Sequence, residues 1–598
     1  MFPPPPPAAR DCLTRIFGFA DFRPSQGAIV GALCAGQDVA AIMPTGAGKS
    51  LCYQIPALVR PGTALVISPL IALMQDQVRA LTGFGVRAAS LTSADPADAQ
   101  ARTRAALERG ALDLLYVSPE RLATPAFQSL LATTRIALVA VDEAHCVSEW
   151  GHDFRPEYRL IRGVLDSLPN VPRIALTATA DANTRADICA NLGIDPANML
   201  VAGFDRPNIT YRVEPRRNPR AQITALLQKH PQASAIIYCR SRAQVDQIAD
   251  ALAAAGFPAL PYHAGLDAPT RSANQARWAA EPGQIMVATV AFGMGVDKPD
   301  VRLVIHLGLP KSIEGYYQET GRAGRDGDPA TAVTLHGSSD ISRNRQWLDE
   351  IEDPARRAIE AERLAALLRF VEATGCRRVP LLAHFGDSPA PSCRACDNCL
   401  SPPRLSDLTE PARKLLSAVY RTGQRFGIAH LTDVLRGQAT PRVNDLGHDR
   451  LPLFGIGADL PKTAWAALAR TLEAEEALLR DADHHGLRLG PAARAILKGE
   501  RSVRVADSAL APRAKRERRR DRGTPADSSD PRFERLRALR RELAVAAGVP
   551  PYVIFHDSVL HAIVAANPRN LADLATIPGV GEAKRERYGA AFLAALGR

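Results

Sequence analysis

Two stretches of the chain alternate short β-rich runs with helical runs, and no other feature restricts the fold as strongly. The first stretch covers about residues 20–205 and the second about residues 206–335, and near Gly327 the alternation stops. This pattern is typical of parallel strands joined by crossover helices, so we expect an α/β fold with two tandem parallel-sheet lobes. The predicted strands are Val39–Met43, Ala64–Ser68, Leu114–Val117, Ile136–Val141, Arg173–Leu176, Ser234–Tyr238, Gln284–Ala288 and Leu303–His306.

A glycine-rich segment, Met43–Ser50, follows the first predicted strand and precedes a helix-compatible run. Its glycines let backbone N–H groups close around phosphate oxygens, while Lys49 would reach the β- and γ-phosphates and Ser50 would offer its hydroxyl to Mg²⁺. Met43 stands where the strict pattern has glycine, and a chance glycine-rich turn is the alternative. We predict a nucleotide site made by Thr45, Gly46, Gly48, Lys49 and Ser50.

The run Ile136–Val141 is a buried-strand pattern that ends in two acids, Asp142 and Glu143. Parallel sheets bind ligands at the carboxyl ends of their strands. Asp142 is predicted to hold Mg²⁺, directly or through water, and Glu143 to orient or deprotonate the attacking water. The alternative is that both acids only cap a helix. The presence of the phosphate-binding segment in the same chain makes this alternative weak.

A glycine-punctuated segment of the second stretch carries two arginines, Arg322 and Arg325, shortly after Gln318. Phosphoryl transfer needs positive charge at the oxygens of the departing γ-phosphate. These arginines lie about 270 residues beyond Lys49, in the second lobe. The predicted site therefore closes between two lobes, and ATP hydrolysis there would move one lobe relative to the other. Arg325 is favoured as the arginine finger, with Arg322 left open.

Four cysteines form a cluster that ends the helical, charged region after residue 340: Cys376, Cys393, Cys396 and Cys399. Four thiolates suit a tetrahedral structural Zn²⁺, which would hold together a platform with little core of its own. An iron–sulfur cluster is less favoured because no cysteine follows three residues after Cys399. Unliganded thiols are the remaining alternative. The scattered cysteines Cys34, Cys52, Cys189 and Cys239 fit reduced core thiols and a cytoplasmic setting.

The net charge of +11 is concentrated near the end of the chain. Residues 501–598 carry 19 lysines and arginines against 11 aspartates and glutamates, a net of +8. An anionic polymer and plain solubility explain such a tail about equally well. The Arg513–Asp530 segment has the composition of a disordered linker. No apolar run is long enough to span a bilayer, and the N-terminus lacks the features of a secretory signal.

Together these motifs resemble those of superfamily-two helicases, and several longer ones resemble the RecQ family in particular. The matching segments are 44–50, 68–71, 118–121, 142–155, 177–179, 206–209, 237–241, 262–265, 288–295 and 318–325. The resemblance runs over nearly the whole chain. It implies two RecA-like lobes and a zinc module at the four cysteines.

The resemblance also implies roles for residues outside the phosphate-binding segment. Phe19, Arg23 and Gln26 match an upstream motif that stacks on adenine and hydrogen-bonds to it. Trp150, His152, Phe154 and Arg155 match an aromatic-rich loop that couples single-stranded DNA to hydrolysis. Aromatic and arginine side chains stack on bases without reading sequence; core packing is the alternative for Trp150 and Phe154.

Two accessory modules follow by resemblance. Residues 408–500 resemble the RecQ winged-helix domain, whose hairpin we expect near Gly437–Arg442, although no aromatic wedge is evident there. Residues 531–598 resemble the helical HRDC domain. Its Gly579-Val-Gly581 turn would open a helix whose free N–H groups suit a DNA phosphate, with Lys584, Arg585 and Arg587 nearby. A solvated helix face is nearly as good an explanation of these three residues.

The sequence therefore predicts a bacterial, cytoplasmic, ATP- and Mg²⁺-dependent 3′→5′ DNA helicase of recombination and repair, with polarity and pathway implied by the resemblance. Its predicted partners are single-stranded, duplex and forked DNA, with a single-stranded-DNA-binding protein as a further candidate, and we expect a monomer. A double-strand translocase and a scaffold with a dead ATPase are the rivals. The expected domains are 1–205, 206–335, 336–403, 404–502, a linker 503–530, and 531–598.

Overall fold

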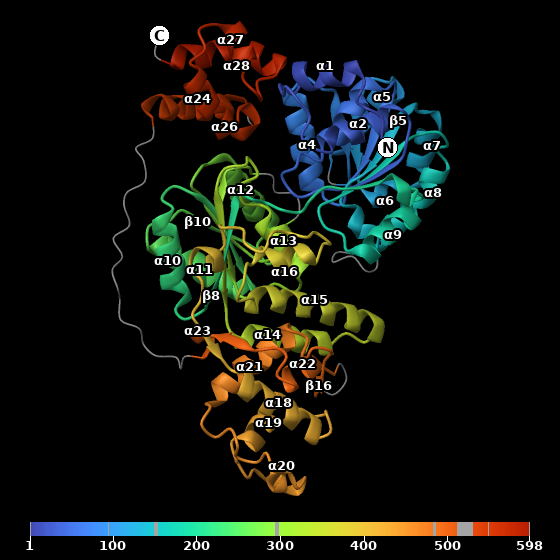
Figure 1. Ribbon diagram of the computed structural model, residues 1–598. Coiled ribbons are helices and arrows are strands. Elements are labelled where there is room, and N and C mark those ends of the chain that lie inside the picture. The colour runs from blue at the N-terminus through green and yellow to red at the C-terminus, as the bar shows by residue number, and fades with distance from the viewer. Residues whose placement is uncertain are drawn as a thin grey trace.

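The computed structural model contains two parallel sheets followed by three smaller modules (Figure 1). It describes all residues except 1, 94, 149–153, 294–297, 482–485, 511–529, 548, 550 and 597–598. The linker predicted at Arg513–Asp530 therefore lies almost wholly outside the described residues. Within the described part of the chain, no helix has the length and apolarity needed to cross a membrane.

The first lobe is built on a seven-stranded, all-parallel sheet with the order β3-β4-β2-β5-β6-β1-β7. Its central strands are buried on both faces, as their continuous apolar runs require. The strands are β1 Val39–Ile42, β2 Thr63–Ile67, β3 Ala88–Leu91, β4 Leu114–Val117, β5 Ile136–Val141, β6 Arg173–Thr177 and β7 Met199–Val201. Their helices are α1 Pro7–Arg15, α2 Gln26–Cys34, α3 Leu51–Val59, α4 Ile71–Gly83, α5 Ala97–Glu108, α6 Pro119–Leu122, α7 Pro125–Thr133, α8 Ile161–Asp166 and α9 Ala182–Leu192.

The second lobe is a six-stranded parallel sheet with the order β10-β11-β9-β12-β13-β8. Its strands are β8 Ile209–Pro215, β9 Ser234–Cys239, β10 Ala259–Tyr262, β11 Ile285–Ala288, β12 Val301–Leu307 and β13 Ala330–His336. Its helices are α10 Pro219–Lys229, α11 Arg242–Ala254, α12 Ala268–Ala280 and α13 Ile313–Thr320. The predicted fold of two tandem parallel-sheet lobes is confirmed.

All eight predicted strands are present, with ends that differ from the prediction by no more than two residues. The two parallel sheets contain five further strands that were not predicted, and four of them (β3, β7, β8 and β10) are the edges of these sheets. The expectation that the alternation stops near Gly327 was wrong, because β13 follows at Ala330. These four edge strands are only partly buried, so their apolar patterns are weak.

A helical platform follows the second lobe and carries the cysteine cluster. Its helices are α14 Ser338–Asp349, α15 Pro354–Glu372, α16 Arg378–Ala383 and α17 Asp397–Leu400, which confirms the predicted helical region. Arg378 is buried and donates hydrogen bonds to the backbone carbonyls of Arg206 and Ile209 at 2.9 and 2.8 Å. Arg185 of the first lobe donates to the Phe385 carbonyl at 2.7 Å. The platform is therefore joined to both lobes.

The winged-helix region has its own apolar core and differs from the prediction at one place. Its helices are α18 Thr409–Arg421, α19 Ile428–Leu435, α20 Pro441–Asp445, α21 Lys462–Ala474, α22 Ala493–Leu497 and α23 Asp507–Leu510. The hairpin expected near Gly437–Arg442 is wrong: Thr440 caps α20 there, its hydroxyl accepting from the Val443 N–H. The antiparallel pair is instead β15 Leu478–Arg480 with β16 Leu487–Leu489, and β14 Leu405–Asp407 pairs with β17 Arg504–Ala506.

The C-terminal domain comprises α24 Pro531–Ala547, α25 Pro551–Ile554, α26 Asp557–Ala566, α27 Leu571–Ala575 and α28 Glu582–Ala595 around a separate apolar core. Figure 1 shows this domain beside both lobes, with α28 toward the first lobe and α24 and α26 over the second. Residues of α24 line a cavity together with α4 of the first lobe and α12 of the second. The C-terminal domain therefore lies next to the first lobe, although the two are far apart in the sequence.

Candidate nucleotide site and metal centre

The phosphate-binding segment leaves β1 and enters α3, as its sequence predicts. The Met43 N–H donates to the Thr177 carbonyl at 3.0 Å, which extends the β1–β6 pairing into the segment. Gly46 and Gly48 have φ values of 79° and 77°, a region that favours glycine. A Cβ at Gly48 would lie 2.6 Å from the Gln26 side-chain nitrogen. Both glycines are therefore favoured by backbone conformation, and a side chain at position 48 would also displace the Gln26 amide.

The acids Asp142 and Glu143 stand at the carboxyl end of β5, beside this segment. Burial raises the pKa of Asp142, the adjacent Glu143 raises it further, and Lys49 opposes them. Glu143 is held at φ 48°, a left-handed conformation that non-glycine residues rarely adopt and that is concentrated at functional sites. The Ser50 hydroxyl and the Asp142 carboxylate are hard oxygen donors that fit Mg²⁺.

The arginine turn of the second lobe touches the phosphate-binding segment directly. The Thr45 hydroxyl donates to the Gly321 carbonyl at 3.0 Å. Arg206, which is buried, donates from Nη1 to the Thr45 carbonyl at 2.7 Å and from Nη2 to the Gly324 carbonyl at 2.8 Å. Sequence reasoning matched Arg206 to a family motif but gave it no role. It holds the two halves of the site together.

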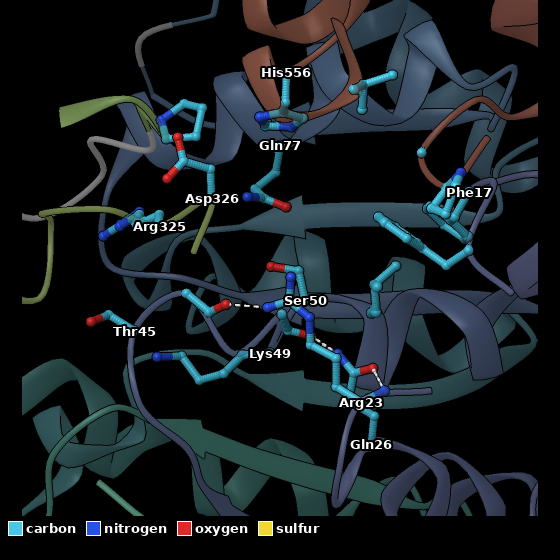
Figure 2. Close-up of a pocket in the computed structure, with 18 of the residues that line it drawn as sticks. Phe17, Arg23, Gln26, Thr45, Lys49, Ser50, Gln77, Arg325, Asp326 and His556 are labelled. Carbon is cyan, nitrogen blue, oxygen red and sulfur yellow. Dashed lines mark hydrogen bonds between the residues drawn. The ribbon is translucent and has the colours of Figure 1, made fainter. Parts of the chain in front are cut away.

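One cavity of about 540 Å³ brings the predicted residues together (Figure 2). All six predicted catalytic residues line it: Lys49, Asp142, Glu143, Gln318, Arg322 and Arg325. So do all the predicted nucleotide-binding residues: Phe19, Arg23, Gln26, Thr45, Gly46, Gly48, Lys49 and Ser50. This volume lies within the range of small-ligand sites. Two lobes therefore share one site, as the spacing of the motifs predicts.

The upstream motif is tied to the phosphate-binding segment through its polar side chains. Arg23 donates to the Gly46 carbonyl. Gln26 donates from its amide to the carbonyls of Ala47 and Gly48 at 3.0 and 3.1 Å and accepts from the Arg23 N–H at 2.8 Å. Phe19 is 36% exposed at the rim. In this structure Gln26 thus orders the loop, which places the predicted adenine contact next to the phosphate contact.

A series of hydrogen bonds runs from His145, close to the two acids in sequence, to Gln318 of the second lobe. His145 Nδ1 lies 2.8 Å from the Thr177 hydroxyl, and the Thr177 hydroxyl donates to the Thr179 carbonyl at 3.2 Å. The Gln318 amide in turn donates to the Thr179 hydroxyl at 3.4 Å. The motifs at 142–145, 177–179 and 318–325 therefore form one connected network across the lobe boundary.

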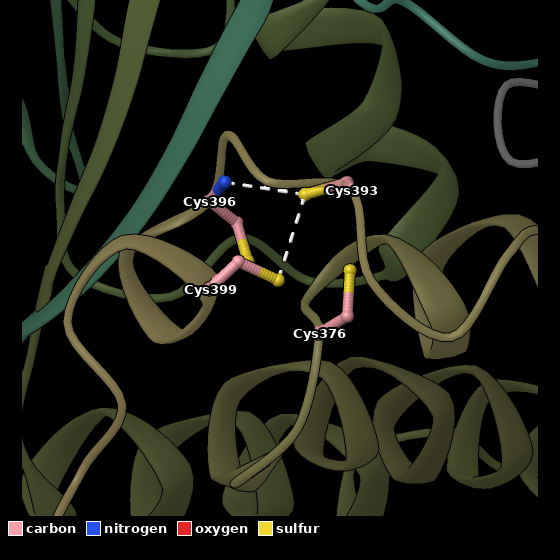
Figure 3. A group of neighbouring side chains, drawn as sticks. All are labelled: Cys376, Cys393, Cys396 and Cys399. Atoms are coloured by element: carbon pink, nitrogen blue, oxygen red, sulfur yellow. Dashed lines mark hydrogen bonds between the residues drawn. The ribbon is translucent and has the colours of Figure 1, made fainter.

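The four predicted metal ligands come together in the platform (Figure 3). Their Sγ atoms all lie within 4.8 Å of one another, and Cys393 Sγ is 3.9 Å from Cys399 Sγ. Tetrahedral Zn–S bonds of about 2.3 Å place sulfurs roughly 3.8 Å apart. The Cys396 N–H points at Cys393 Sγ at 3.2 Å and the Arg377 N–H at Cys396 Sγ at 3.4 Å, which suits thiolates. The cluster is a structural zinc site.

Family comparisons cover nearly every part of the chain. They match the DEAD/DEAH box helicase family over 23–188, the helicase conserved C-terminal domain over 219–327, RecQ zinc-binding over 338–400, the RQC domain over 402–514 and the HRDC domain over 529–596. Among curated proteins, the chain is similar to one named ATP-dependent DNA helicase RecQ from Haemophilus influenzae, with 40% identity over 99% of this chain and 96% of the relative. The chain belongs to the RecQ helicase family. RecQ relatives from Pasteurella multocida and Bacillus subtilis are 41% and 37% identical, each over 98% of this chain and over 93% and 98% of their own lengths.

Part of the RecQ aromatic-rich loop can be placed in this structure. Trp150 and His152 lie outside the described residues. Phe154 is half-buried, with the Arg159 guanidinium 5.3 Å from its ring centroid. Arg155 donates to the Pro69 carbonyl at 3.1 Å, and its N–H to the Cys146 carbonyl at 3.0 Å. The end of the loop is therefore anchored on the segment that leads from β2 to α4.

The three basic residues predicted to contact DNA in the RecQ HRDC domain do not share one exposed face. Lys584 is buried against the first lobe, Arg585 is half-buried and Arg587 is exposed. Lys584, with Phe555 and His556, instead lines the nucleotide cavity. Nothing in the sequence signals this, because the contact joins residues more than 500 positions apart.

Proposed function

We propose that this chain is an ATP-dependent DNA helicase that moves 3′→5′ on single-stranded DNA and separates duplex strands in recombination and repair. The single observation that carries the proposal is the shared cavity. Residues 45–46 and 48–50 of the first lobe and Arg322 and Arg325 of the second lobe line this one cavity. When the ligand in a site shared by two lobes changes, the position of one lobe relative to the other changes with it. The full-length similarity to three bacterial proteins named ATP-dependent DNA helicase RecQ supports the same function.

In the proposed mechanism the first lobe binds the nucleotide. The backbone N–H groups near Gly46 and Gly48 and the Lys49 ammonium hold the phosphates, and the rim at Phe19 faces the base. Ser50 and Asp142 would hold Mg²⁺, which neutralises charge on the phosphate oxygens when bound. Glu143 accepts a hydrogen bond from the attacking water and orients it in line with the γ-phosphate.

The second lobe completes the site from the opposite side. Arg325 and Arg322 stabilise the charge that develops on the phosphoryl oxygens. Arg206 couples this change to movement of the lobes. Its guanidinium donates hydrogen bonds to the Thr45 carbonyl of the first lobe and to the Gly324 carbonyl of the second. Loss of the γ-phosphate removes the attraction between the lobes, and DNA held by both lobes is then advanced.

DNA contact is proposed at the aromatic-rich loop and in the accessory modules. Stacking of Trp150, His152, Phe154 and Arg155 on unpaired bases would hold the strand without reading its sequence. The described end of this loop is bonded to Pro69 and Cys146, so strand contact can reach Asp142 and Glu143 through the backbone. The zinc cluster has four protein ligands and leaves no open position, so its role is structural.

We further propose the six-part division 1–205, 206–335, 336–403, 404–510, 511–530 and 531–598, each part with the role that its sequence predicts. The winged-helix part was expected to end at residue 502; it is extended because β17 pairs with β14 and α23 packs against the same core. The protein acts as a monomer on forked and partly single-stranded DNA. A single-stranded-DNA-binding protein is the expected protein partner. Mass measurement of the protein with and without forked DNA tests the monomer, and one protomer per fork is the expected result.

The rival functions differ from the proposal in one measurement. A double-strand translocase would hydrolyse ATP on duplex DNA without separating strands, and a scaffold would bind DNA without turnover. ATP hydrolysis and strand separation are therefore measured on the same tailed duplex, with Lys49→Ala as the inactive reference. Hydrolysis stimulated by single-stranded DNA together with separated strands supports the proposal. Hydrolysis without separation leaves the translocase, and DNA binding without hydrolysis leaves the scaffold.

A further inference from the structure

Helix α13 of the second lobe leads directly into the arginine turn of the nucleotide site. It spans Ile313–Thr320, and Arg322 and Arg325 follow within five residues of its end. Gln318, in its last turn, lines the nucleotide cavity and donates from its amide to the Thr179 hydroxyl of the first lobe at 3.4 Å. The position of α13 therefore sets where the second lobe contributes to the site.

Glu314, in the first turn of α13, is buried and contacts the zinc platform. His384, the C-cap of α16, places Nε2 2.5 Å from Glu314 Oε1. Arg363 of α15 places Nε 3.6 Å from the same oxygen, and the side chains of Glu314 and Arg363 are each 4% exposed. Figure 1 shows α13 next to α15. Glu314 and Gln318 are four residues apart on one helix, so the platform contact and the site residue lie on the same face.

The charge on Glu314 depends on these two platform residues. Burial would raise its pKa, but the hydrogen bond from His384 and the positive charges of His384 and Arg363 together lower it to about 2. Glu314 is therefore ionised at neutral pH, and an arginine stays protonated there. Removal of one partner of a buried ion pair leaves the other charge uncompensated, which is strongly destabilising. The contact therefore fixes the first turn of α13 on the platform.

Arg363 faces the first lobe as well as the second. Its Nη2 lies 3.9 Å from Asp181 Oδ2, and Asp181 is the N-cap of α9. Asp181 comes two positions after Thr179, the residue that Gln318 contacts. Arg363 Nη1 is held by Glu360 of its own helix at 2.9 Å. One buried arginine of the platform therefore lies between an acid of each lobe.

Aromatic side chains continue the platform contact along α13. Tyr316 packs against Phe370 with ring centroids 4.7 Å apart, and Tyr317 packs against Phe385 with centroids 4.9 Å apart. All four rings are buried. Packing alone is the alternative, in which the platform stabilises the second lobe without affecting turnover. Apolar contacts tolerate small shifts, whereas a planar guanidinium between carboxylates fixes direction as well as distance.

We propose that Arg363 and His384 of the zinc platform are positioning residues for ATP hydrolysis. They hold Glu314, and through α13 they set how the arginine turn meets the phosphate-binding segment. Neither residue lines the nucleotide cavity, so their effect on turnover passes through α13. This role rests on the proposed hydrolysis at the cavity, and it makes the platform part of the motor.

Arg363→Met in the full chain tests this role, because it removes the charge and keeps the approximate length of the side chain. Single-turnover hydrolysis with single-stranded DNA should slow at least roughly tenfold, since small displacements of groups at a reacting centre are costly. Kd for a fluorescent ATP analogue with Mg²⁺ should stay within about threefold, because the first lobe still holds the nucleotide. A slower chemical step without weaker binding is the signature of a positioning role.

Arg363→Lys is the conservative variant and should recover most of the rate, because it restores a positive charge between Glu314 and Asp181. Arg356→Met, at an exposed arginine of the same helix, is the matched control and should behave like the unaltered protein. His384→Leu removes the second contact to Glu314 and should show the same slow hydrolysis with unchanged Kd. It keeps the test valid if Arg363→Met folds poorly. Zinc content and the thermal midpoint show whether each variant is folded.

Two results would overturn the proposal. One is an unchanged single-turnover rate in folded, zinc-containing Arg363→Met and His384→Leu. The other is a slower rate that Arg363→Lys does not recover and that follows the loss of thermal stability from variant to variant, which would make the contact a stabilising one only. Neither result touches the helicase function, which fails only if the unaltered protein shows no DNA-stimulated hydrolysis at saturating ATP.

Discussion

Arg206 Nη1 donates a hydrogen bond of 2.7 Å to the Thr45 carbonyl of the phosphate-binding segment. Arg206 is the first residue after the expected boundary between the lobes, so this hydrogen bond joins the second lobe to the first. The same guanidinium reaches the carbonyls of Gly321, Ala323 and Gly324 in the arginine turn. Burial lowers its pKa from the usual arginine value. This buried cation is bonded to backbone on both sides, which makes it the mechanical joint of the site.

Arg206→Ala should therefore uncouple the lobes. We expect DNA-stimulated kcat to fall about 100-fold, comparable to the loss of one preorganised donor at an active site, with a smaller change in nucleotide Kd. Steady-state hydrolysis and equilibrium nucleotide binding measure the two effects. Arg212→Ala, at an arginine of β8 that pairs with Glu214, is the control. Equal losses in the two variants would mean that the effect is not specific to the joint.

Glu143→Gln should bind ATP but fail to hydrolyse it. The carboxylate that orients the water is replaced by an amide of the same shape, so turnover should fall at least roughly 100-fold. Single-turnover hydrolysis and nucleotide binding check this, with the exposed Glu120→Gln as the control. Turnover within threefold of the unaltered protein would remove Glu143 from the mechanism.

Phe154→Ala tests the coupling of strand contact to hydrolysis. We expect basal hydrolysis and nucleotide binding to persist while stimulation by single-stranded DNA falls, because each stacked base contributes roughly 1–3 kcal/mol. Tyr420→Ala, at an aromatic residue of α18 that is 66% exposed, is the matched control. Full stimulation in Phe154→Ala at all DNA concentrations would show that Phe154 only packs.

Removal of one zinc ligand should unfold the platform. Cys396→Ser should reduce the zinc content of purified protein from one equivalent to near zero and make residues 373–400 protease-sensitive, since metal binding supplies the folding free energy of such modules. Elemental analysis and limited proteolysis measure this, with Cys34→Ser, outside the cluster, as the control. Iron in place of zinc, or unchanged zinc in Cys396→Ser, would contradict the assignment.

The docking of the C-terminal domain should depend on pH through Lys584. Burial lowers its pKa to about 7 in the docked domain, and a lysine in water has a pKa of about 10.4. Between these values docking releases a proton, so docking strengthens as pH rises, by up to roughly tenfold per pH unit, and is independent of pH below about 7.

Small-angle scattering without nucleotide checks this pH dependence, because undocking increases the radius of gyration. The radius should fall between pH 7 and pH 9 in the unaltered protein. Lys584→Met removes the titrating group but keeps the length of the side chain, so its radius should not change over this range. The same pH dependence in both proteins would assign the effect to another group.

How far the sequence predicts this protein is visible in particular residues. Lys49, Asp142 and Arg325 were predicted to share a site from their motifs, and they line one cavity because parallel sheets present the ends of their strands on one edge. The hairpin at Gly437–Arg442 was wrong because Thr440 and Pro441 form a cap and first turn of a helix. The close approach of Gly581 to Gly18 could not be predicted, since a contact between two glycines leaves no compositional trace.

The central claim is that hydrolysis at the two-lobed site drives directional strand separation. A fluorescent duplex with a 3′ single-stranded tail and its twin with a 5′ tail, each incubated with the protein, ATP and Mg²⁺, test it most directly. Rapid separation of the 3′-tailed duplex, with little of the 5′-tailed one and none with Lys49→Ala, is the predicted result. Preference for the 5′ tail, or no separation of either duplex despite DNA-stimulated hydrolysis, would contradict it.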